Sequence, residues 1–214
     1  MKQNLKKVVF AQGSFWGPEG IYAVLPGVEK IKIGYTGGTT LDPTYDHIND
    51  HTEAVYIEYD PNLIRLSDLL TVFWNSHDPT ILNKNRFKSA IYFSNDNELT
   101  IVANSRTKLQ TELVRPILTE ILPLGKFYEA EECYQKFNLR SYDMLFESLK
   151  SQDGRLAHDD HVMTRLNGFL SGYGTLEQLD KESSHWNLKA QQIHYIRQIM
   201  KQKCRTRYIS ESMD

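Results

Sequence analysis

The feature that most constrains the fold is an apolar strand that passes into a helix within a few residues. Residues 8–11 have the character of a buried strand, residues 12–13 interrupt it, and residues 18–25 continue at helical spacing. Ser14 therefore lies where the strand meets the first turn of the helix. A helix N-terminus carries unpaired N–H groups and a partial positive charge, which stabilise a thiolate far more than a neutral hydroxyl. The turn thus predicts a site suited to an anion. Its side chain, the neutral hydroxyl of Ser14, is stabilised little by the helix N-terminus.

The order of the later elements predicts the fold class. A loop over residues 36–51, rich in Gly, Thr, Asp and Asn, separates two strands and is typical of a functional segment. The β-α-β-β-α-β order of the first six elements predicts an α+β protein, in which helices pack on a mixed β-sheet to form a ferredoxin-like two-layer core. The predicted strands are residues 8–11, 28–35, 54–61, 88–94 and 119–122, and the predicted helices are residues 18–25, 66–74 and 97–113.

The sequence changes character after about residue 138. The remainder has no convincing strand, and its apolar residues recur at helical spacing. We therefore expect two parts, a sheet-containing domain over residues 1–140 and a helical C-terminal extension over residues 141–214 that ends in a flexible tail. Gly168, Gly172 and Gly174 predict a flexible link inside the extension.

Charge and cysteine content exclude several classes of function. The formal net charge of the 214 residues is -2, so no basic surface favours nucleic acid. No apolar run approaches the ~20 residues that span a bilayer, and the first residues lack the pattern of a signal peptide, so we expect a cytoplasmic protein without a membrane partner. Cys133 and Cys204 are too few for a disulfide framework or a zinc site, so we expect no metal and no bound cofactor.

Two residues near the long loop carry groups suited to catalysis. Glu53 joins the polar loop to the start of an apolar strand, which makes it a candidate proton donor. Tyr45, inside the loop, offers a hydroxyl donor. Taken singly, each has an ordinary alternative, since Glu53 would equally suit a solvated strand end and Tyr45 an unremarkable loop position.

Seven motifs in unbroken order, over roughly residues 6 to 140, resemble the methionine sulfoxide reductase A family. They are Gly-Ser-Phe-Trp-Gly at residues 13–17, Gly-Tyr-Thr-Gly-Gly-Thr at 34–39, Asp-Pro-Thr-Tyr at 42–45, His-Thr-Glu-Ala-Val at 51–55, Tyr-Asp-Pro at 59–61, Phe-Trp-Asn-Ser-His-Asp-Pro-Thr at 73–80 and Phe-Tyr-Glu-Ala-Glu at 127–131. Residues 166–174 are similar to an extension found in some longer members.

The resemblance implies a peptide-methionine (S)-S-oxide reductase, which reduces the S-epimer of methionine sulfoxide, free or in oxidised proteins, to methionine. In the family, a cysteine at the position of Ser14 attacks the sulfoxide sulfur, and the residue matching Glu53 protonates the sulfoxide oxygen. Phe15 and Trp16 would form an apolar box for the substrate methyl group, and Tyr45 would donate a hydrogen bond to the oxygen. The implied reductant is thioredoxin or another dithiol, and a monomer is expected.

The main departure from the family is Ser14 itself. The attack requires a soft thiolate that ends as a sulfenic acid, and serine provides neither, so the chain is predicted to be inactive. Two explanations stand. The favoured one is an engineered cysteine-to-serine change at residue 14 of a reductase. The alternative is a natural, non-catalytic protein that binds methionine sulfoxide or oxidised peptides. A serine hydrolase is a weaker interpretation, because nothing places a histidine base such as His51 beside Ser14.

A second departure lies in the loop over residues 80–88, which is shorter than is common in the family and lacks its acidic residue. Phe87 stands where the family has a second oxygen-binding tyrosine, and a phenyl ring cannot donate a hydrogen bond. Either the donors already named suffice, or the hydroxyl of Tyr128 or Tyr134 takes its place. In addition, Cys133 and Tyr134 replace the usual Tyr-His pair.

The remaining cysteines and histidines leave alternatives open. Cys204, in a basic tail, is either a resolving cysteine for the sulfenic acid or a tail cysteine without a redox role. Cys133 is interpreted as a small buried residue. His77 belongs to a structural motif of the family, and residues 158–161 (His-Asp-Asp-His) are interpreted as a turn with helix-capping aspartates rather than a metal site.

Overall fold

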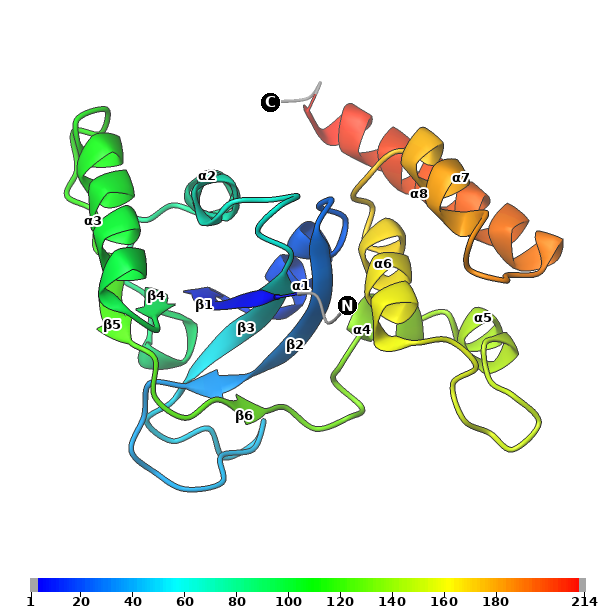
Figure 1. Cartoon of the computed structure of the whole chain (residues 1–214), viewed down its shortest axis with the longest axis horizontal. Coiled ribbons are helices and arrows are strands. Elements are labelled where there is room, and N and C mark those ends of the chain that lie inside the picture. Colours follow the sequence, from blue (N-terminus) through cyan, green and yellow to red (C-terminus); the bar gives the residue numbers. More distant parts are fainter. Residues whose placement is uncertain (1–3, 212–214) are drawn as a thin grey trace.

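The apolar segment near the start of the chain forms β1 (Lys6–Gln12), whose last five residues are buried. It pairs antiparallel with β3 (Thr52–Tyr59) on one side and with β4 (Ser89–Phe93) on the other. The computed structural model describes the backbone of residues 4–211 and the side chains of residues 4–203. Within that range β1 and β3 lie at the centre of a six-stranded sheet of order β5-β4-β1-β3-β2-β6 (Figure 1).

The outer strands complete a mixed sheet. β2 (Val28–Thr36) pairs antiparallel with β3, and the short β6 (Tyr128–Glu129) pairs antiparallel with β2. At the opposite edge β5 (Glu120–Pro123) runs parallel to β4, which requires a crossover, and α3 (Asp96–Gln110) provides it. The predicted α+β class with helices on a mixed sheet is confirmed, and its closer description as a ferredoxin-like two-layer core stays a prediction.

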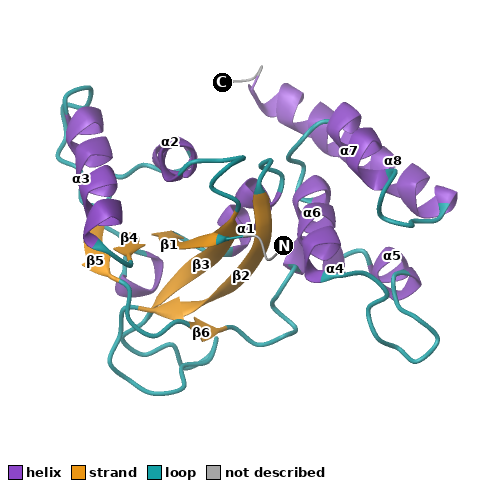
Figure 2. Ribbon diagram, viewed as in Figure 1, coloured by secondary structure: helices purple, strands orange, loops and turns teal. Residues whose placement is uncertain are grey.

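Two helices cover the central strands, α1 (Trp16–Ala23) and α2 (Leu66–Asn75) (Figure 2). Their apolar faces share one core cluster with the sheet, in which the ring of Phe10 on β1 packs against Tyr22 of α1 and Phe73 of α2 at centroid distances of 5.5 and 5.1 Å. The core therefore fixes α1 directly against the strand that leads into it.

The C-terminal third is helical and lies beside the β2 side of the sheet (Figure 1). A second apolar cluster joins these helices and also includes Val24, the residue that ends α1. The helices are α4 (Phe137–Arg140), α5 (Asp143–Ser148), α6 (Asp160–Leu170), α7 (Leu176–Ser183) and α8 (Ala190–Glu211).

Two glycines allow α6 to approach α1 closely. A Cβ added to Gly168 would lie 2.8 Å from Cβ of Ala23, and one added to Gly20 would lie 2.5 Å from Oγ of Ser171. The prediction that Gly168 belongs to a flexible link is therefore wrong, because this glycine is buried inside α6 at a helix contact. Gly172 and Gly174 do lie beyond α6, at positive φ in the turn that follows it.

The C-terminal end of α1 is closed by polar groups from the later helices. Arg165 of α6, with a side chain only 2% exposed, donates hydrogen bonds to the carbonyls of Ala23 (2.6 Å) and Leu25 (3.0 Å). Its charge is balanced by Glu182 of α7 at 2.5 Å, and Gln178 donates to the Val24 carbonyl at 2.7 Å. The last carbonyls of a helix normally lack partners, and here buried side chains supply them.

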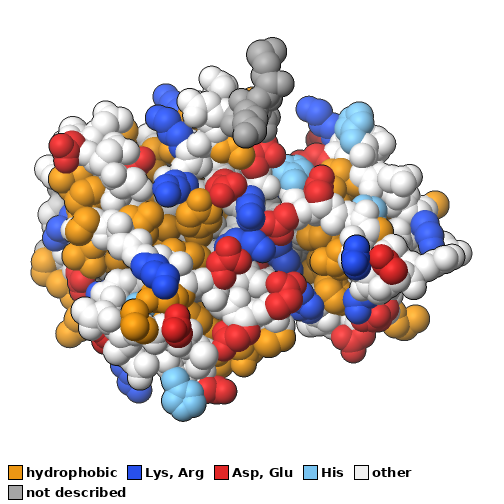
Figure 3. Space-filling view, turned by 60° about the horizontal axis from the view of Figure 1, so that its bottom comes forward, with side chains coloured by type: hydrophobic (Ala, Val, Ile, Leu, Met, Phe, Trp, Pro, Cys, Tyr) orange, Lys and Arg blue, Asp and Glu red, His pale blue; other side chains and the backbone are white. Residues whose placement is uncertain are grey.

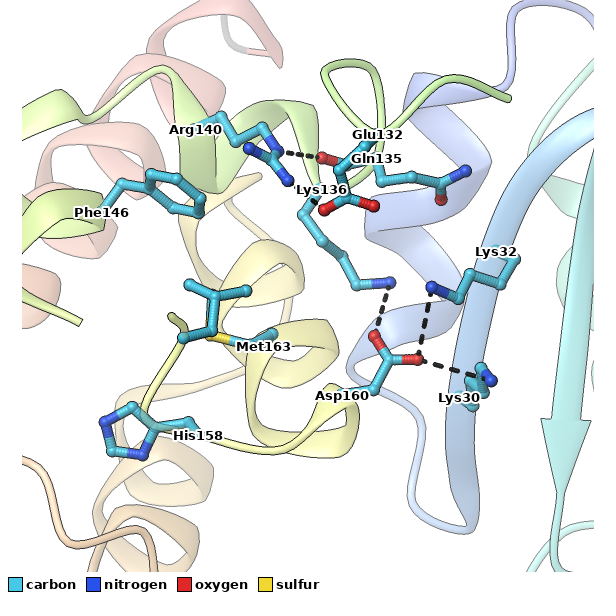
Figure 4. Close-up of a pocket in the computed structure, with 11 residues that line it drawn as sticks. Lys30, Lys32, Glu132, Gln135, Lys136, Arg140, Phe146, His158, Asp160 and Met163 are labelled. Carbon is cyan, nitrogen blue, oxygen red and sulfur yellow. Dashed lines mark hydrogen bonds and ion pairs between the residues drawn. The ribbon is translucent and has the colours of Figure 1, made fainter. Parts of the chain in front are cut away.

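A charged junction joins β2 to α6 around a cavity of about 310 Å³ (Figure 4). Lys30 and Lys32 of β2 and Lys136, which precedes α4, all point toward Asp160 at distances of 3.6 to 3.9 Å. Lys136 also reaches the buried Glu19 of α1 at 4.0 Å, and burial lowers the pKa of Lys136 and raises that of Glu19. The junction thus links α1, the sheet and α6 through one set of charges.

Cationic and anionic side chains are mixed on the face of the molecule drawn in Figure 3, in keeping with the small net charge. Among the helices of the described residues, none is long and apolar enough to cross a membrane.

Candidate active site

Ser14 lies in the turn between β1 and α1. Gly13 takes a φ of +90°, a conformation open to glycine at little cost, and this lets the chain turn sharply before α1 begins at Trp16. The side chain of Ser14 is exposed, and the N-cap residue Phe15 makes no capping hydrogen bond with its side chain. The positive end of α1 therefore faces the solvent-accessible turn that carries Ser14.

Glu53 lies directly behind this turn. It is the second residue of β3, only 1% exposed, and its Oε2 accepts a hydrogen bond of 3.1 Å from the backbone N–H of Phe15. Its Oε1 accepts a second hydrogen bond, of 2.7 Å, from Nε of Arg86. A buried carboxylate is tolerated when such partners are present, so the alternative of a solvated strand-end carboxylate is wrong.

Arg86 is a site residue that the sequence did not reveal. It lies in a short 3-10 helix, η1 (Asn85–Phe87), and its guanidinium packs over the ring of Tyr45, with Cζ 4.3 Å from the ring centroid. Nη1 of Arg86 donates to the Tyr45 carbonyl at 3.0 Å. The sequence offered one signal for Arg86, namely its place next to Phe87 in a loop that lacks the acidic residue expected from the family.

Aromatic side chains gather around the start of α1. The Trp16 ring stacks on Tyr45 and on Phe137, at centroid distances of 5.7 and 4.4 Å, and Tyr134 packs on Tyr45 at 4.5 Å. The Phe15 ring lies 5.5 Å from the Trp16 ring but is fully buried. Trp16 and Phe137, both partly exposed, therefore give the cluster accessible apolar surface, while Phe15 supports it from beneath.

Two carboxylates hold the long loop that carries Tyr45. Glu131 accepts hydrogen bonds from the backbone N–H of Tyr45 (3.0 Å) and from the hydroxyl of Tyr35 (2.9 Å). Partial burial opposes the ionisation of Glu131, but these hydrogen bonds outweigh it and lower its pKa. Asp50 likewise binds the N–H and hydroxyl groups of the threonines at residues 39–40, which lower its pKa.

The two tyrosines considered as substitutes for a donor at residue 87 lie in different places. Tyr134 packs in the aromatic cluster, whereas Tyr128, on β6, packs its ring edge-on to His51 at 5.4 Å. His51 itself binds the Gly38 N–H and the Thr40 carbonyl, within the loop. Neither Tyr128 nor His51 is in contact with the Ser14 turn through any of these interactions.

The remaining cysteine and histidine predictions have separate outcomes. Cys133 is exposed, so its interpretation as a buried residue is wrong. Cys204 lies outside the residues whose side chains are described. His77 bridges the Phe73 carbonyl (2.8 Å) and Ser89 (2.7 Å), and burial lowers its pKa, as suits a structural role.

The residues of the His-Asp-Asp-His segment diverge. Asp159 caps α6 through the Val162 N–H at 2.9 Å, Asp160 faces the lysines, and His161 faces Glu29 at 3.2 Å. Across residues 4–203, no three His, Cys, Asp or Glu side chains converge in a way that would hold a metal ion.

Known proteins are similar to this chain in sequence and in fold. A family model described as peptide methionine sulfoxide reductase matches residues 6–164. Peptide methionine sulfoxide reductase MsrA from Clostridium acetobutylicum is 38% identical over 143 residues, which cover 62% of this chain and 88% of that protein. The peptide methionine sulfoxide reductase of Drosophila melanogaster is 34% identical over 189 residues, covering 87% of this chain and 76% of its own.

Solved structures agree with these relatives. Mxr1 from Saccharomyces cerevisiae in its reduced form has a TM-score of 0.62 at 26% identity and covers 67% of this chain and 88% of its own. The same protein in complex with Trx2 has a TM-score of 0.50 at 29% identity, and the match covers 62% of this chain and 85% of the Mxr1 chain. Because the family model spans the whole sheet, the site and the start of the helical region, and so more than half of the chain, the chain belongs to the peptide methionine sulfoxide reductase family.

Proposed function

We propose that this chain has the site of a peptide-methionine (S)-S-oxide reductase, with Ser14 at the position of the nucleophilic cysteine. It binds the S-epimer of methionine sulfoxide and does not reduce it. The observation that carries this proposal is the hydrogen bond of 3.1 Å between Glu53 and the Phe15 N–H, which holds a carboxyl group beside residue 14. Family membership supports the substrate class.

The proposed roles follow from the chemistry of a sulfoxide. The substrate methyl group lies against Trp16, with Phe15 behind it, and Tyr45 donates a hydrogen bond to the oxygen. With a cysteine at position 14, a thiolate attacks the sulfoxide sulfur, and Glu53 in its protonated form supplies a proton to the oxygen. The carboxylate that pairs with Arg86 is Glu53 before it takes up that proton. The oxygen ends on the cysteine as a sulfenic acid, and the two-electron-reduced thioether leaves as methionine.

A dithiol then completes the proposed cycle. One thiol attacks the sulfenic acid and releases water, and the second resolves the mixed disulfide, which restores the thiol. A thioredoxin-like protein is the proposed donor, since Mxr1, a structural relative, has been solved in complex with Trx2. Cys204, in the basic tail, is the alternative resolving cysteine in this proposal.

The test is to make Ser14→Cys and to assay both epimers of a methionine sulfoxide peptide with dithiothreitol. We expect turnover of the S-epimer only, with none for the unmodified chain. Ser14→Ala is the matched control, because it changes the same atom without adding a thiol. A Ser14→Cys protein that is folded but leaves the S-epimer unreduced would reject the reductase assignment.

A second candidate rests on Ser14 itself, a residue without redox chemistry in a site that keeps Glu53, Tyr45 and Trp16. It is a natural binding protein for methionine sulfoxide or oxidised peptides. Sulfoxide binding by the unmodified chain, together with an inactive Ser14→Cys variant, would favour this function over the reductase.

A further inference from the structure

Phe87 removes a hydrogen-bond donor from the site, and the residue beside it brings a stronger one. A phenyl ring has no polar hydrogen, whereas a guanidinium has five N–H groups and a permanent positive charge. η1 directs Arg86, rather than Phe87, to Glu53. The loop has therefore exchanged a neutral donor at one position for a charged donor at the next.

Arg86 is only partly satisfied by the protein. Nε and Nη1 bind Glu53 and the Tyr45 carbonyl, while Nη2 is buried and has no hydrogen-bond partner among the described residues. Nε1 of Trp16 is buried without a partner in the same way. Both donors belong to side chains that pack against the Tyr45 ring. Cζ of Arg86 lies 4.3 Å from its centroid, and the Trp16 ring centroid lies 5.7 Å from it. Buried N–H groups without acceptors are costly, and a strong acceptor within reach of the Arg86 Nη2 would relieve that cost.

Glu53 contributes acceptors rather than donors in this arrangement. Both of its oxygens accept hydrogen bonds, one from Phe15 and one from Arg86. The carboxylate thereby fixes the guanidinium, and the Tyr45 ring beneath it limits its movement. A sulfoxide oxygen carries a large partial negative charge, so a fixed cation with free N–H groups is a suitable partner for it.

We infer that Arg86 binds the sulfoxide oxygen of the substrate through its free guanidinium N–H groups, an inference that rests on the proposed function. It takes over the role of the tyrosine that is absent at residue 87. Arg86 is then a substrate-binding residue that selects the sulfoxide over the thioether, which is identical except for the missing oxygen.

The experiment compares two ligands by calorimetry at fixed ionic strength, the S-epimer of N-acetylmethionine sulfoxide N-methylamide and its thioether parent. The unmodified chain should prefer the sulfoxide. Arg86→Met should reduce that preference by about 10- to 100-fold, the range of a hydrogen bond from a charged donor. Arg86→Met combined with Phe87→Tyr should recover part of it, because the hydroxyl returns to the family position.

Lys88→Met is the matched control. It removes a cation two residues away that pairs with Glu120 at 3.1 Å, outside the site, and should leave the preference unchanged. If Arg86→Met fails to fold, Arg86→Gln removes the charge and keeps a donor for Glu53. A folded Arg86 variant with an unchanged sulfoxide preference would overturn this inference alone. Failure of the unmodified chain to bind the sulfoxide, with an inactive Ser14→Cys variant, would overturn the proposed function as well.

Discussion

At its C-terminal end α1 is enclosed by protein, whereas its N-terminal end opens to solvent. The carbonyls of Ala23 and Leu25 accept hydrogen bonds from the buried Arg165, and Gly168 brings α6 against the same turn. At the other end Ser14 is exposed, and the surrounding contacts are made by aromatic rings and one fixed carboxylate. The first arrangement stabilises the position of the helix, and the second leaves its positive end available to a ligand.

This comparison predicts that changes at the closed end act on stability and changes at the open end act on binding. Arg165→Leu should have the largest effect, a loss of about 3–5 kcal/mol in the free energy of unfolding, because it removes a buried cation and leaves the partly buried Glu182 and two carbonyls without their donor. Urea denaturation measures it.

The control for Arg165 is Arg197→Leu. Arg197 pairs with Asp180 at a similar distance but with both side chains more than 40% exposed, so the loss should stay below about 1 kcal/mol. Equal losses for the two variants would show that the closed end of α1 has no special role.

Gly168→Ala is the second test of the closed end. The added methyl group would lie 2.7 Å from Cγ1 of Val24 and 3.1 Å from the Gly20 carbonyl, so α6 must move away from α1. We expect a net loss of about 1–3 kcal/mol, even though alanine favours a helix. Gly125→Ala, where an added Cβ meets nothing within 4 Å, is the control and should change little. A stabilised Gly168→Ala protein would contradict the close packing.

Phe137→Ala tests the open end. The ring stacks on Trp16 at 4.4 Å and is 42% exposed, so its loss should remove apolar surface from the site and little from the core. We expect sulfoxide binding to weaken by about 2- to 10-fold, which corresponds to about 0.5–1.5 kcal/mol for an aromatic contact. Met144→Ala, at a residue 87% exposed, should leave calorimetric binding unchanged. A stability loss larger than the loss in binding would place Phe137 with the closed end instead.

The sequence predicted the open end better than the closed one. The strand, the turn at Gly13 and the position of Glu53 follow from local patterns, because each depends on residues adjacent in the chain. Arg165 and Gly168 act on α1 across more than 140 residues, and no local pattern identifies such a partner. Gly168 resembled a loop glycine because glycine disfavours helices, and the tertiary contact with α1 overrides that preference.

Arg86 was missed for a related reason. Its neighbour Phe87 occupies the position at which a donor was expected, and only the three-dimensional course of η1 shows that the adjacent side chain reaches Glu53. The two-residue β6 was missed because so short a strand has no periodicity to detect.

The smallest effect at neutral pH is expected for Asp50, which holds the loop beside the open end. The backbone N–H of Thr39 and the hydroxyls of Thr40 and Thr39 stabilise its carboxylate and hold its pKa well below the usual range. A pKa that folding lowers adds stability above the unfolded value of about 3.9, and that stability is lost as the pH falls through the folded value. The protection of the Thr39 and Thr40 amides against hydrogen exchange, measured relative to the intrinsic exchange rate at each pH, should therefore fall below about pH 4. In Asp50→Asn these two amides should exchange faster at neutral pH, and their protection should no longer depend on pH in this range.

The control is the set of amides at the closed end of α1, whose protection should not respond to acid in either protein. A response there that matches the loop would show that the two ends of α1 open together.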